Sequence, residues 1–390
     1  MKNSKVFVTD AQMRSSLAVI RSLGKRGINV TAGEETRWAT GFFSRYCNHK
    51  VVYPSPKKNR DAFVDFLIRH LKENKYDALY PVAEFCLNPI MENYDEISRY
   101  TRIGLPRPEI FQTGFDKGIT LKIALENKIP CPKTFFINGL DDIKNLAKTL
   151  DYPLILKPCI GAGRRGVEIC NSFDEIIEKY NKNYPVYGKQ LLQEFIPSAG
   201  EFGVYTLFNS ESEPRAVSVQ RRIRSYPYYG GPSTLRETFK NNISALAVPT
   251  AFKLLQSMKW SGLAMVEFRI DSRDNIPKLM EVNPRFWGSL QLSILAGVDF
   301  PFLYYQMMLE GDIDPVLDYS EGVQCRWLLP GDILWFLTTP NKLKNFPEFL
   351  KFQPNDDIIS LYDPGPTVGF FLATLRYLFD KDMWQLVLRR

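Results

Sequence analysis

Two carboxylates and one amide in the last third of the sequence have the types and spacing to hold a metal ion. Glu267 lies in the stretch Met-Val-Glu-Phe-Arg, and Glu281 and Asn283 lie in Met-Glu-Val-Asn-Pro-Arg. Both stretches are predicted strands, and alternation along a strand puts Glu281 and Asn283 on one face. Magnesium takes such oxygen ligands and shares them with substrate phosphates, so one or two ions are expected. Arg285 adds a fixed cation for a transferring phosphoryl group.

The alternative interpretation of these residues is a wet sheet face with three solvated polar side chains. The residues around them are apolar, at 263–266 before Glu267 and at 279–280 before Glu281. A carboxylate among apolar neighbours costs free energy unless it is paired or bound to a metal. The metal site is therefore the interpretation that the residues favour.

A lysine and a glycine-rich loop follow one another in the middle of the chain. Lys157 ends a predicted strand over residues 153–158. The loop after it contains three glycines: Gly161, Gly163 and Gly166. Glycines let backbone N–H groups approach phosphate oxygens and a lysine adds a charge, so this pattern predicts phosphate binding, although the P-loop spacing is absent. A surface β-hairpin with a basic tip is the alternative.

Four further residues have the types that contact a nucleotide. Glu194 and Ile196 lie where a predicted strand meets a turn, and Glu201 follows them. Free backbone groups in such a hinge can read a purine edge, and an acidic side chain can accept hydrogen bonds from ribose hydroxyls. Lys117 is near a predicted helix start, where the helix dipole does not favour a cation, so a ligand role is the functional interpretation. Solvated surface positions are the alternative for the glutamates and for the lysine.

The elements that must position these residues follow from the hydrophobic pattern. Strands at 5–9, 29–32 and 78–82 alternate with helices at 15–26 and 63–73. This order is typical of a parallel, doubly wound sheet. The first turn has no glycine, which excludes the dinucleotide-binding fingerprint, and Ser15 or Ser16 can cap the helix after it.

From residue 107 the pattern changes to mixed helices and strands. Helices are predicted at 116–127, 141–150, 173–180 and 243–258, and strands at 153–158, 167–169, 190–195, 202–208 and 214–221. The two strands with the metal-type residues follow the last of these helices. From about residue 318 the chain is rich in Trp, Phe, Leu and Pro, which indicates a C-terminal extension.

Composition and charge exclude several classes of protein. The 390 residues are enough for two or three domains, and the 45% hydrophobic content is typical of soluble proteins. The net charge of +7 contains no Lys/Arg block, so no nucleic-acid partner is expected. The six cysteines form no C-x-x-C pair, which indicates reduced thiols in the cytoplasm. We expect neither a signal peptide nor an apolar run of about 18–20 residues that spans a membrane.

The order of these motifs resembles the ATP-grasp superfamily, and within it the carbamoyl-phosphate-synthase-like carboxylate–amine ligases. The resemblance covers residues 1 to about 312 and depends most on the Glu-x-Asn-Pro-Arg element at 281–285. It implies that Lys117 and Lys157 hold ATP phosphates, with the glycine loop closing over them. It also implies an adenine hinge at Glu194 and the backbone of Ile196.

By the same resemblance, Glu201 binds the ribose and the magnesium ligands are Glu267, Glu281 and Asn283, with manganese as an alternative ion. Arg285 and Lys157 are the implied catalytic residues, and Arg285 stabilises an acyl-phosphate. The implied reaction is attack of a carboxylate on the γ-phosphate of ATP, release of ADP, and attack of an amine on the acyl carbon. An ATP-dependent carboxylase or kinase-like enzyme, and a catalytically silent regulatory or scaffold protein, are the alternatives.

The resemblance also implies the α/β and α+β architecture of the chain. It predicts a Rossmann-like preATP-grasp domain over 1–106, and a two-part ATP-grasp domain over 107–317 with a lid at about 151–197. A C-terminal extension over 318–390 follows.

In related ligases the segment after residue 220 lies beside the acceptor site, which makes Arg222, Gly231 and Ser233 candidate contacts for the acyl substrate. An exposed strand end and turn is the alternative. The expected partners are a small carboxylate and an amine. The apolar stripe of the last helix predicts packing on the protein's own core or on a twin subunit in a homodimer, with contact to a membrane surface as the less favoured alternative.

Overall fold

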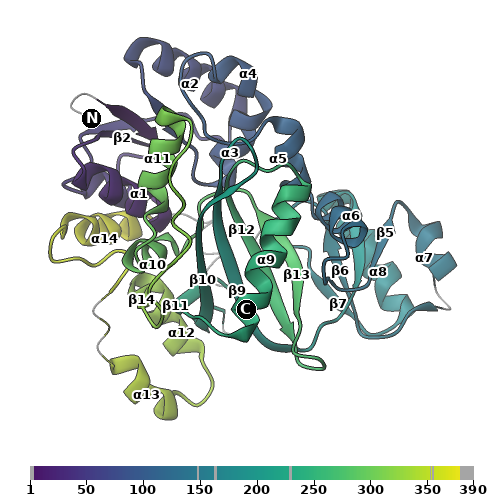
Figure 1. Ribbon diagram of the computed structural model, residues 1–390. Helices are drawn as coiled ribbons and strands as arrows, with labels where there is room; N and C mark the ends of the chain where they lie inside the picture. The colour runs from purple at the N-terminus through teal and green to yellow at the C-terminus, as the bar shows by residue number, and fades with distance from the viewer. Residues whose placement is uncertain are drawn as a thin grey trace. The chain divides into compact units, whose positions relative to one another are not determined.

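The computed structural model describes residues 4–146, 149–161, 165–227, 231–351, 353 and 355–377. These residues separate into two compact units. Figure 1 labels their helices and strands. The first unit comprises Met1–Pro108, Ile223–Thr238 and Arg285–Arg390, and the second comprises Glu109–Arg222 and Phe239–Pro284. The three-domain division expected from the sequence stays a prediction.

The first unit begins with the predicted parallel sheet. Its strands are β1 (Lys5–Val8), β2 (Asn29–Glu34), β3 (His49–Val52) and β4 (Ala78–Tyr80). They are ordered β3-β2-β1-β4 with parallel pairing throughout, which confirms the predicted sheet. The connecting helices are α1 (Arg14–Lys25), the 3-10 helix η1 (Thr40–Phe43) and α2 (Arg60–Asn74). The helices α3 (Glu84–Glu92) and α4 (Tyr94–Ile97) follow β4.

The predicted serine cap of the first helix is wrong. The N-cap position of α1 is Met13, which makes no side-chain cap, and Ser15 and Ser16 lie buried inside the helix. The hydroxyl of Ser16 donates a hydrogen bond to the carbonyl oxygen of Thr9 at 2.9 Å. This hydrogen bond links α1 to the end of β1, because the hydroxyl of a serine inside a helix can donate to a nearby backbone carbonyl.

The rest of the first unit is built from later parts of the chain. Strand β11 (Ser233–Thr238) pairs antiparallel with β14 (Gln324–Arg326). The helices are α10 (Leu290–Leu295), α11 (Phe300–Glu310), the π-helix η3 (Leu328–Asp332), α12 (Ile333–Thr338), α13 (Lys342–Leu350) and α14 (Gly365–Tyr377). Helix α14 packs on η1, where two of its glycines make room for the ring and backbone of Phe43.

The second unit contains a small antiparallel sheet ordered β5-β8-β6-β7. Its strands are β5 (Thr134–Ile137), β6 (Leu154–Pro158), β7 (Glu168–Cys170) and β8 (Gln190–Glu194). The helices beside it in the chain are α5 (Pro108–Phe115), α6 (Lys117–Glu126), α7 (Leu140–Leu146) and α8 (Phe173–Tyr187). Ile137, Leu156, Ile176 and Leu192 form its buried core. Helix α8 extends seven residues beyond the predicted end at 180, and Tyr180 stacks on Tyr184 one turn later.

A larger antiparallel sheet completes the second unit. Its strands are β9 (Ser198–Phe208), β10 (Pro214–Ser225), β12 (Gly262–Asp271) and β13 (Pro277–Asn283), in the order β13-β12-β9-β10. The last residues of β10, from Ile223 on, belong to the first unit. Helix α9 (Asn242–Ser257) packs on β9 through Phe252, whose ring meets Phe208 edge-on at 5.7 Å between centroids. Within the described part of the chain, no helix is long and apolar enough to cross a membrane.

Candidate functional site

The two carboxylates expected to bind metal face each other across adjacent strands of the second unit. In the register of β12 and β13, Glu267 is opposite Glu281 and Met265 is opposite Asn283. The amide of Asn283 donates to Glu281 Oε1 at 3.1 Å. Like charges that are directly opposed destabilise a sheet unless a cation compensates them. Positive charge is therefore needed next to Glu267 and Glu281.

Two lysines supply positive charge on the Glu281 side. Lys117 is the first residue of α6, whose N-cap Asp116 accepts from the backbone N–H of Gly118 at 2.7 Å. Lys117 Nζ is 3.2 Å from Glu281 Oε2 and donates to the carbonyl of Gly161 at 2.6 Å. Lys157, at the end of β6, is buried and donates to the carbonyl of Met280 at 3.4 Å.

The buried setting shifts the protonation equilibria of this group. Burial lowers the pKa of Lys157 to about 8, and the charge of Glu281 only partly opposes that shift. Burial also raises the pKa of Glu281, but Lys117, the Asn283 amide and Lys157 together hold that pKa below its usual value. Glu281 is therefore an anion, and Lys157 carries a proton that it can lose within the working pH range of many enzymes.

An arginine supplies the charge on the Glu267 side. Arg222 Nη2 is 3.0 Å from Glu267 Oε2, and its Nη1 is 2.9 Å from Glu201 Oε2. The charge of Glu267 raises the pKa of Arg222, which keeps the guanidinium protonated. Arg269, opposite Glu201 in the β12–β9 register, donates from Nε to Glu201 Oε1 at 3.1 Å. Neighbouring strands thus bring Glu201, Arg222, Glu267 and Glu281 into one polar network.

The residues of the expected adenine hinge make contacts of their own. Glu194 ends β8, and its Oε1 is 2.6 Å from Arg273 Nη2. Its Oε2 accepts from the backbone N–H of Lys133 at 3.2 Å. Ile196 is buried, and the next residue, Pro197, accepts from the N–H of Ser272 at 2.9 Å. Residues 194–197 are thus bonded to the turn between β12 and β13 through Ser272 and Arg273.

For the glycine-rich loop after β6, the structure describes Gly161 at one end and Gly166 at the other. Gly161 has φ +152° and Gly166 has φ +71°, a left-handed value that favours glycine. A Cβ on Gly166 would lie 2.8 Å from Pro158 and from Tyr187. Gly163 lies outside the described residues. The loop therefore needs glycine at Gly166 for both its conformation and its packing.

Three of the expected site residues belong to the first unit. Arg285 Nε donates to Glu84 Oε1 at 3.0 Å, and its Nη1 donates to the carbonyl of Phe286 at 3.1 Å. The N–H of Gly231 donates to the carbonyl of Pro227 at 3.0 Å, and a Cβ at this position would overlap the Tyr226 carbonyl. The carbonyl of Ser233, in β11, accepts from an arginine at 3.3 Å.

Some charged residues of these networks were not among the predicted ones, and Glu84 and Arg269 are examples. Glu84 opens the helix after β4, at the carboxyl end of a parallel strand, where ligands of such sheets commonly bind. Arg269 lies two residues after Glu267 on the same strand, so the strand period could have put both side chains on one face. Position relative to a strand was the available signal for both.

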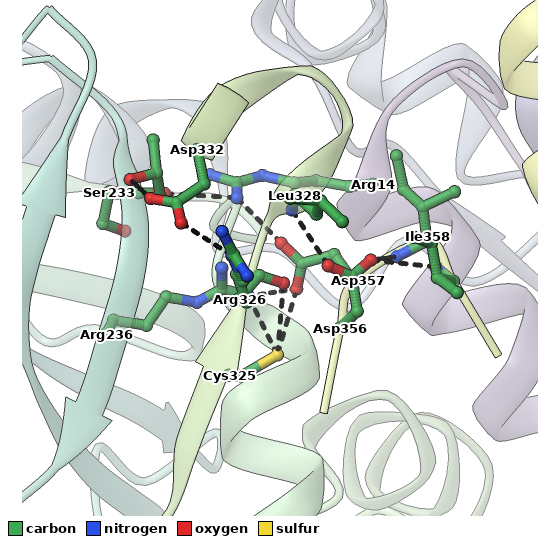
Figure 2. A network of polar contacts seen from close by, with 12 residues as sticks. Arg14, Ser233, Arg236, Cys325, Arg326, Leu328, Asp332, Asp356, Asp357 and Ile358 are labelled. Carbon is green, nitrogen blue, oxygen red and sulfur yellow. Dashed lines mark hydrogen bonds and ion pairs between the residues drawn. The ribbon is translucent and has the colours of Figure 1, made fainter. Parts of the chain in front are cut away.

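The first unit also contains a polar network that is buried (Figure 2). Asp357 is 2.8 Å from Arg14 Nη1 and also pairs with Arg236. Asp332 is 2.6 Å from Arg326 Nε and accepts from the hydroxyl of Thr234 at 2.8 Å. Figure 2 shows these side chains converging from α1, β11, β14, η3 and the segment after α13. Nothing in the sequence pattern predicted this network.

The donors around Glu267 fit a divalent cation of the magnesium type. No group of three His, Cys, Asp or Glu side chains able to hold a metal occurs in the described part of the chain. Two carboxylates and one amide oxygen suit magnesium, which uses one or two carboxylates and completes its shell with water and substrate phosphates. The residues thus fit an ion that arrives with a nucleotide.

Comparison with known proteins gives one family and several relatives. Residues 191–329 match the family model described as "ATP-grasp in the biosynthetic pathway with Ter operon". A D-alanine–D-alanine ligase of Wolbachia pipientis wMel is 23% identical over 206 residues, which cover 51% of this chain and 63% of the relative. The chain thus spans less than two thirds of that relative's length.

Two solved structures share the fold. One is the biotin carboxylase domain of a 2-oxoglutarate carboxylase from Hydrogenobacter thermophilus, in complex with MgADP, ADP and bicarbonate. It has a TM-score of 0.68 and 16% identity, over 83% of this chain and 74% of that one. The L-amino acid ligase of Bacillus licheniformis has a TM-score of 0.63 and 19% identity, over 81% and 78%. The chain has the ATP-grasp fold, and its residues 191–329 match an ATP-grasp family model.

Proposed function

We propose that this protein is an ATP-dependent ligase that activates a carboxylate as an acyl-phosphate, releases ADP, and joins the acyl group to an amine. One observation carries the proposal: the opposed carboxylates Glu267 and Glu281 lie next to Lys117 and Lys157 within one unit. This arrangement combines anions for a metal with cations for phosphates. The similarity to a D-alanine–D-alanine ligase and the shared fold with an L-amino acid ligase support the same reaction.

In this proposal the second unit binds Mg-ATP. Lys117 and Lys157 contact the phosphates, and the loop from Gly161 to Gly166 closes over them. Glu194 and the backbone of Ile196 bind the adenine. Glu201 accepts from the ribose hydroxyls, and this requires it to exchange a partner, because arginines occupy both of its oxygens in the structure. The MgADP complex of the related carboxylase domain supports ATP and magnesium as the cofactors.

The metal in this proposal is held by Glu267, Glu281 and Asn283, and manganese can replace magnesium. When bound, it neutralises charge on the phosphates and aligns them for transfer. Arg285 then stabilises the charge of the acyl-phosphate, and Glu84 positions Arg285 through the 3.0 Å bond to its Nε. The positive charge of Lys157 stays next to the phosphate oxygens while the bond between the β- and γ-phosphates breaks.

The substrates in this proposal are a small carboxylate and an amine. Arg222 has a planar guanidinium that can bind a carboxylate through two nitrogens, and Gly231 and Ser233 are further candidate contacts for the acyl substrate. The three-domain division, the homodimer and the cytoplasmic location stay predictions. Of the apolar stripe, Phe371 and Leu375 are exposed on α14, while Leu378, Phe379 and Leu386 lie outside the described residues. Sedimentation of the pure protein tests the predicted homodimer.

A single incubation tests the proposed reaction. Pure protein is mixed with Mg-ATP and a pool of amino acids, small acids and amines, and nucleotide products and condensed products are followed by mass. We expect ADP, phosphate and a product that has lost water relative to its two substrates. AMP and pyrophosphate would contradict the acyl-phosphate route.

A second candidate function is carboxylation, because the related carboxylase domain was solved with bicarbonate. The same incubation separates the two functions. ADP release that depends on bicarbonate and needs no amine indicates a carboxylase. Phosphate transfer to a stable acceptor indicates a kinase-like enzyme. ATP binding without any turnover in the complete pool indicates a regulatory or scaffold protein.

A further inference from the structure

Arg222 holds two carboxylates at once, and both belong to the nucleotide and metal site proposed above. Its Nη2 is 3.0 Å from Glu267 and its Nη1 is 2.9 Å from Glu201. The three side chains are 23–30% exposed, so solvent and solutes reach them. A planar guanidinium with one nitrogen on each carboxylate fixes both acids in place.

These contacts use the same oxygen atoms that a loaded site requires. Arg222 bonds Oε2 of Glu267, which is the expected metal ligand. It also bonds Oε2 of Glu201, the expected ribose contact, while Arg269 bonds Oε1. A guanidinium and a divalent cation at the same carboxylate repel one another, and they compete for its lone pairs.

We propose that Arg222 is a substitute cation: it occupies the metal position beside Glu267 before ligands bind and leaves it when Mg-nucleotide arrives. This inference rests on the proposed function of the second unit. The released guanidinium is then able to bind the carboxylate of the acid substrate. Nucleotide therefore binds before the acid, because the acid's partner is engaged until Glu201 and Glu267 take up other ligands.

The opposite role for Arg222 predicts the opposite result. If Arg222 stays in place and orients Glu267, its loss weakens metal binding, as the loss of supporting residues does at other metal sites. If it is a substitute cation, its loss strengthens metal binding. Arg269 is a matched control, because within the described residues it bonds Glu201 but not Glu267.

The test is a titration with Mn²⁺ in the absence of nucleotide, with free ion counted by electron paramagnetic resonance. The proteins are the wild type, Arg222→Gln, Arg222→Lys, Arg269→Gln and Glu267→Gln. We expect Arg222→Gln to bind Mn²⁺ about tenfold more tightly than the wild type, within the usual range for coupled sites. Arg222→Lys keeps a charge and should stay near the wild-type value, as should Arg269→Gln. Circular dichroism of each variant checks that it is folded.

The outcomes separate this inference from the proposed function. Unchanged or weaker Mn²⁺ binding in Arg222→Gln overturns the substitute-cation role, and so does an equal gain in Arg269→Gln. If Glu267→Gln loses Mn²⁺ in that case, the metal site itself stands. If Glu267→Gln binds Mn²⁺ as well as the wild type does, the metal assignment fails and this inference fails with it. Absence of binding in all five proteins also overturns it, since Arg222→Gln should expose the site.

Discussion

The two units each contain a network of arginines and acids, and the two networks differ in burial. In the first unit, Asp357 and Arg236 have side chains that are 1% exposed. In the second unit, Arg222 is 30% exposed and Glu267 is 23% exposed. A buried ion pair that loses one partner leaves an uncompensated charge in a dry interior, whereas partly exposed ions can exchange a partner for water or for a ligand.

The difference in burial indicates a separate role for each network. The acids of the first unit hold distant segments together, since Asp357 contacts Arg14 of α1 and Arg236 of β11. Asp363 does the same with Arg21, at 2.9 Å. The C-terminal segment is thus integrated into the first unit by charges. The network of the second unit has the accessibility that a binding site needs.

The largest expected effect is on stability, from a change in the buried network. Asp357→Asn should lower the free energy of unfolding of the first unit by about 3–5 kcal/mol, because Arg14 and Arg236 keep their charges without the partner. Urea unfolding followed by tryptophan fluorescence measures this change.

The matched control is Glu92→Gln, which removes an exposed partner of Arg60. It should cost less than about 1 kcal/mol. Equal losses in the two variants would remove the distinction between buried and exposed networks.

The next effect is on activity, from a change in the partly exposed network of the second unit. Glu281→Ala should lower turnover by a factor of about 10²–10³ or more, because a proposed metal ligand and the partner of Lys117 are both lost. The free energy of unfolding should fall by less than in Asp357→Asn, since the removal also relieves the repulsion from Glu267. Steady-state ADP release and urea unfolding give the two numbers. Full activity in this variant would contradict the metal assignment.

A smaller effect is expected from pH. Lys157 has a pKa of about 8 because it is buried, so it loses its positive charge as the pH rises through that value. Its neutral form binds phosphate less well, and nucleotide affinity should therefore fall above about pH 8, by up to about tenfold per pH unit. Titration with a fluorescent ATP analogue across this range measures the fall.

Lys157→Arg provides the control for the pH effect. Arginine keeps its charge throughout this range, so the decline in affinity should disappear. A decline of the same size in Lys157→Arg would assign the effect to another group.

Local patterns were sufficient to predict the strand pair and its acids. Glu281 and Asn283 follow the period of a strand, and the apolar residues around them identify that strand. The parallel sheet of the first unit followed from alternating elements for the same reason. In each case every single strand or helix is predicted from a short run of neighbouring residues.

Contacts that depend on distant strand pairing could not be predicted from the sequence. Arg222 meets Glu201 and Glu267 only because β10, β9 and β12 are neighbours in the sheet. Arg14, Arg236 and Asp357 share no motif and come together only through the fold. The expected serine cap of α1 failed because the Ser16 hydroxyl binds Thr9 instead. The contacts that the sequence did not predict are thus mainly those between residues that lie far apart in the chain.

The proposal that Glu267 and Glu281 hold the magnesium ion of the nucleotide is tested by equilibrium binding of a fluorescent ATP analogue with and without Mg²⁺. The wild type is compared with a variant that carries both Glu267→Gln and Glu281→Gln. We expect Mg²⁺ to strengthen binding to the wild type about tenfold or more and to leave the variant unchanged, because the opposed carboxylates are the proposed ligands of the ion. Equal strengthening by Mg²⁺ in the two proteins would contradict the account.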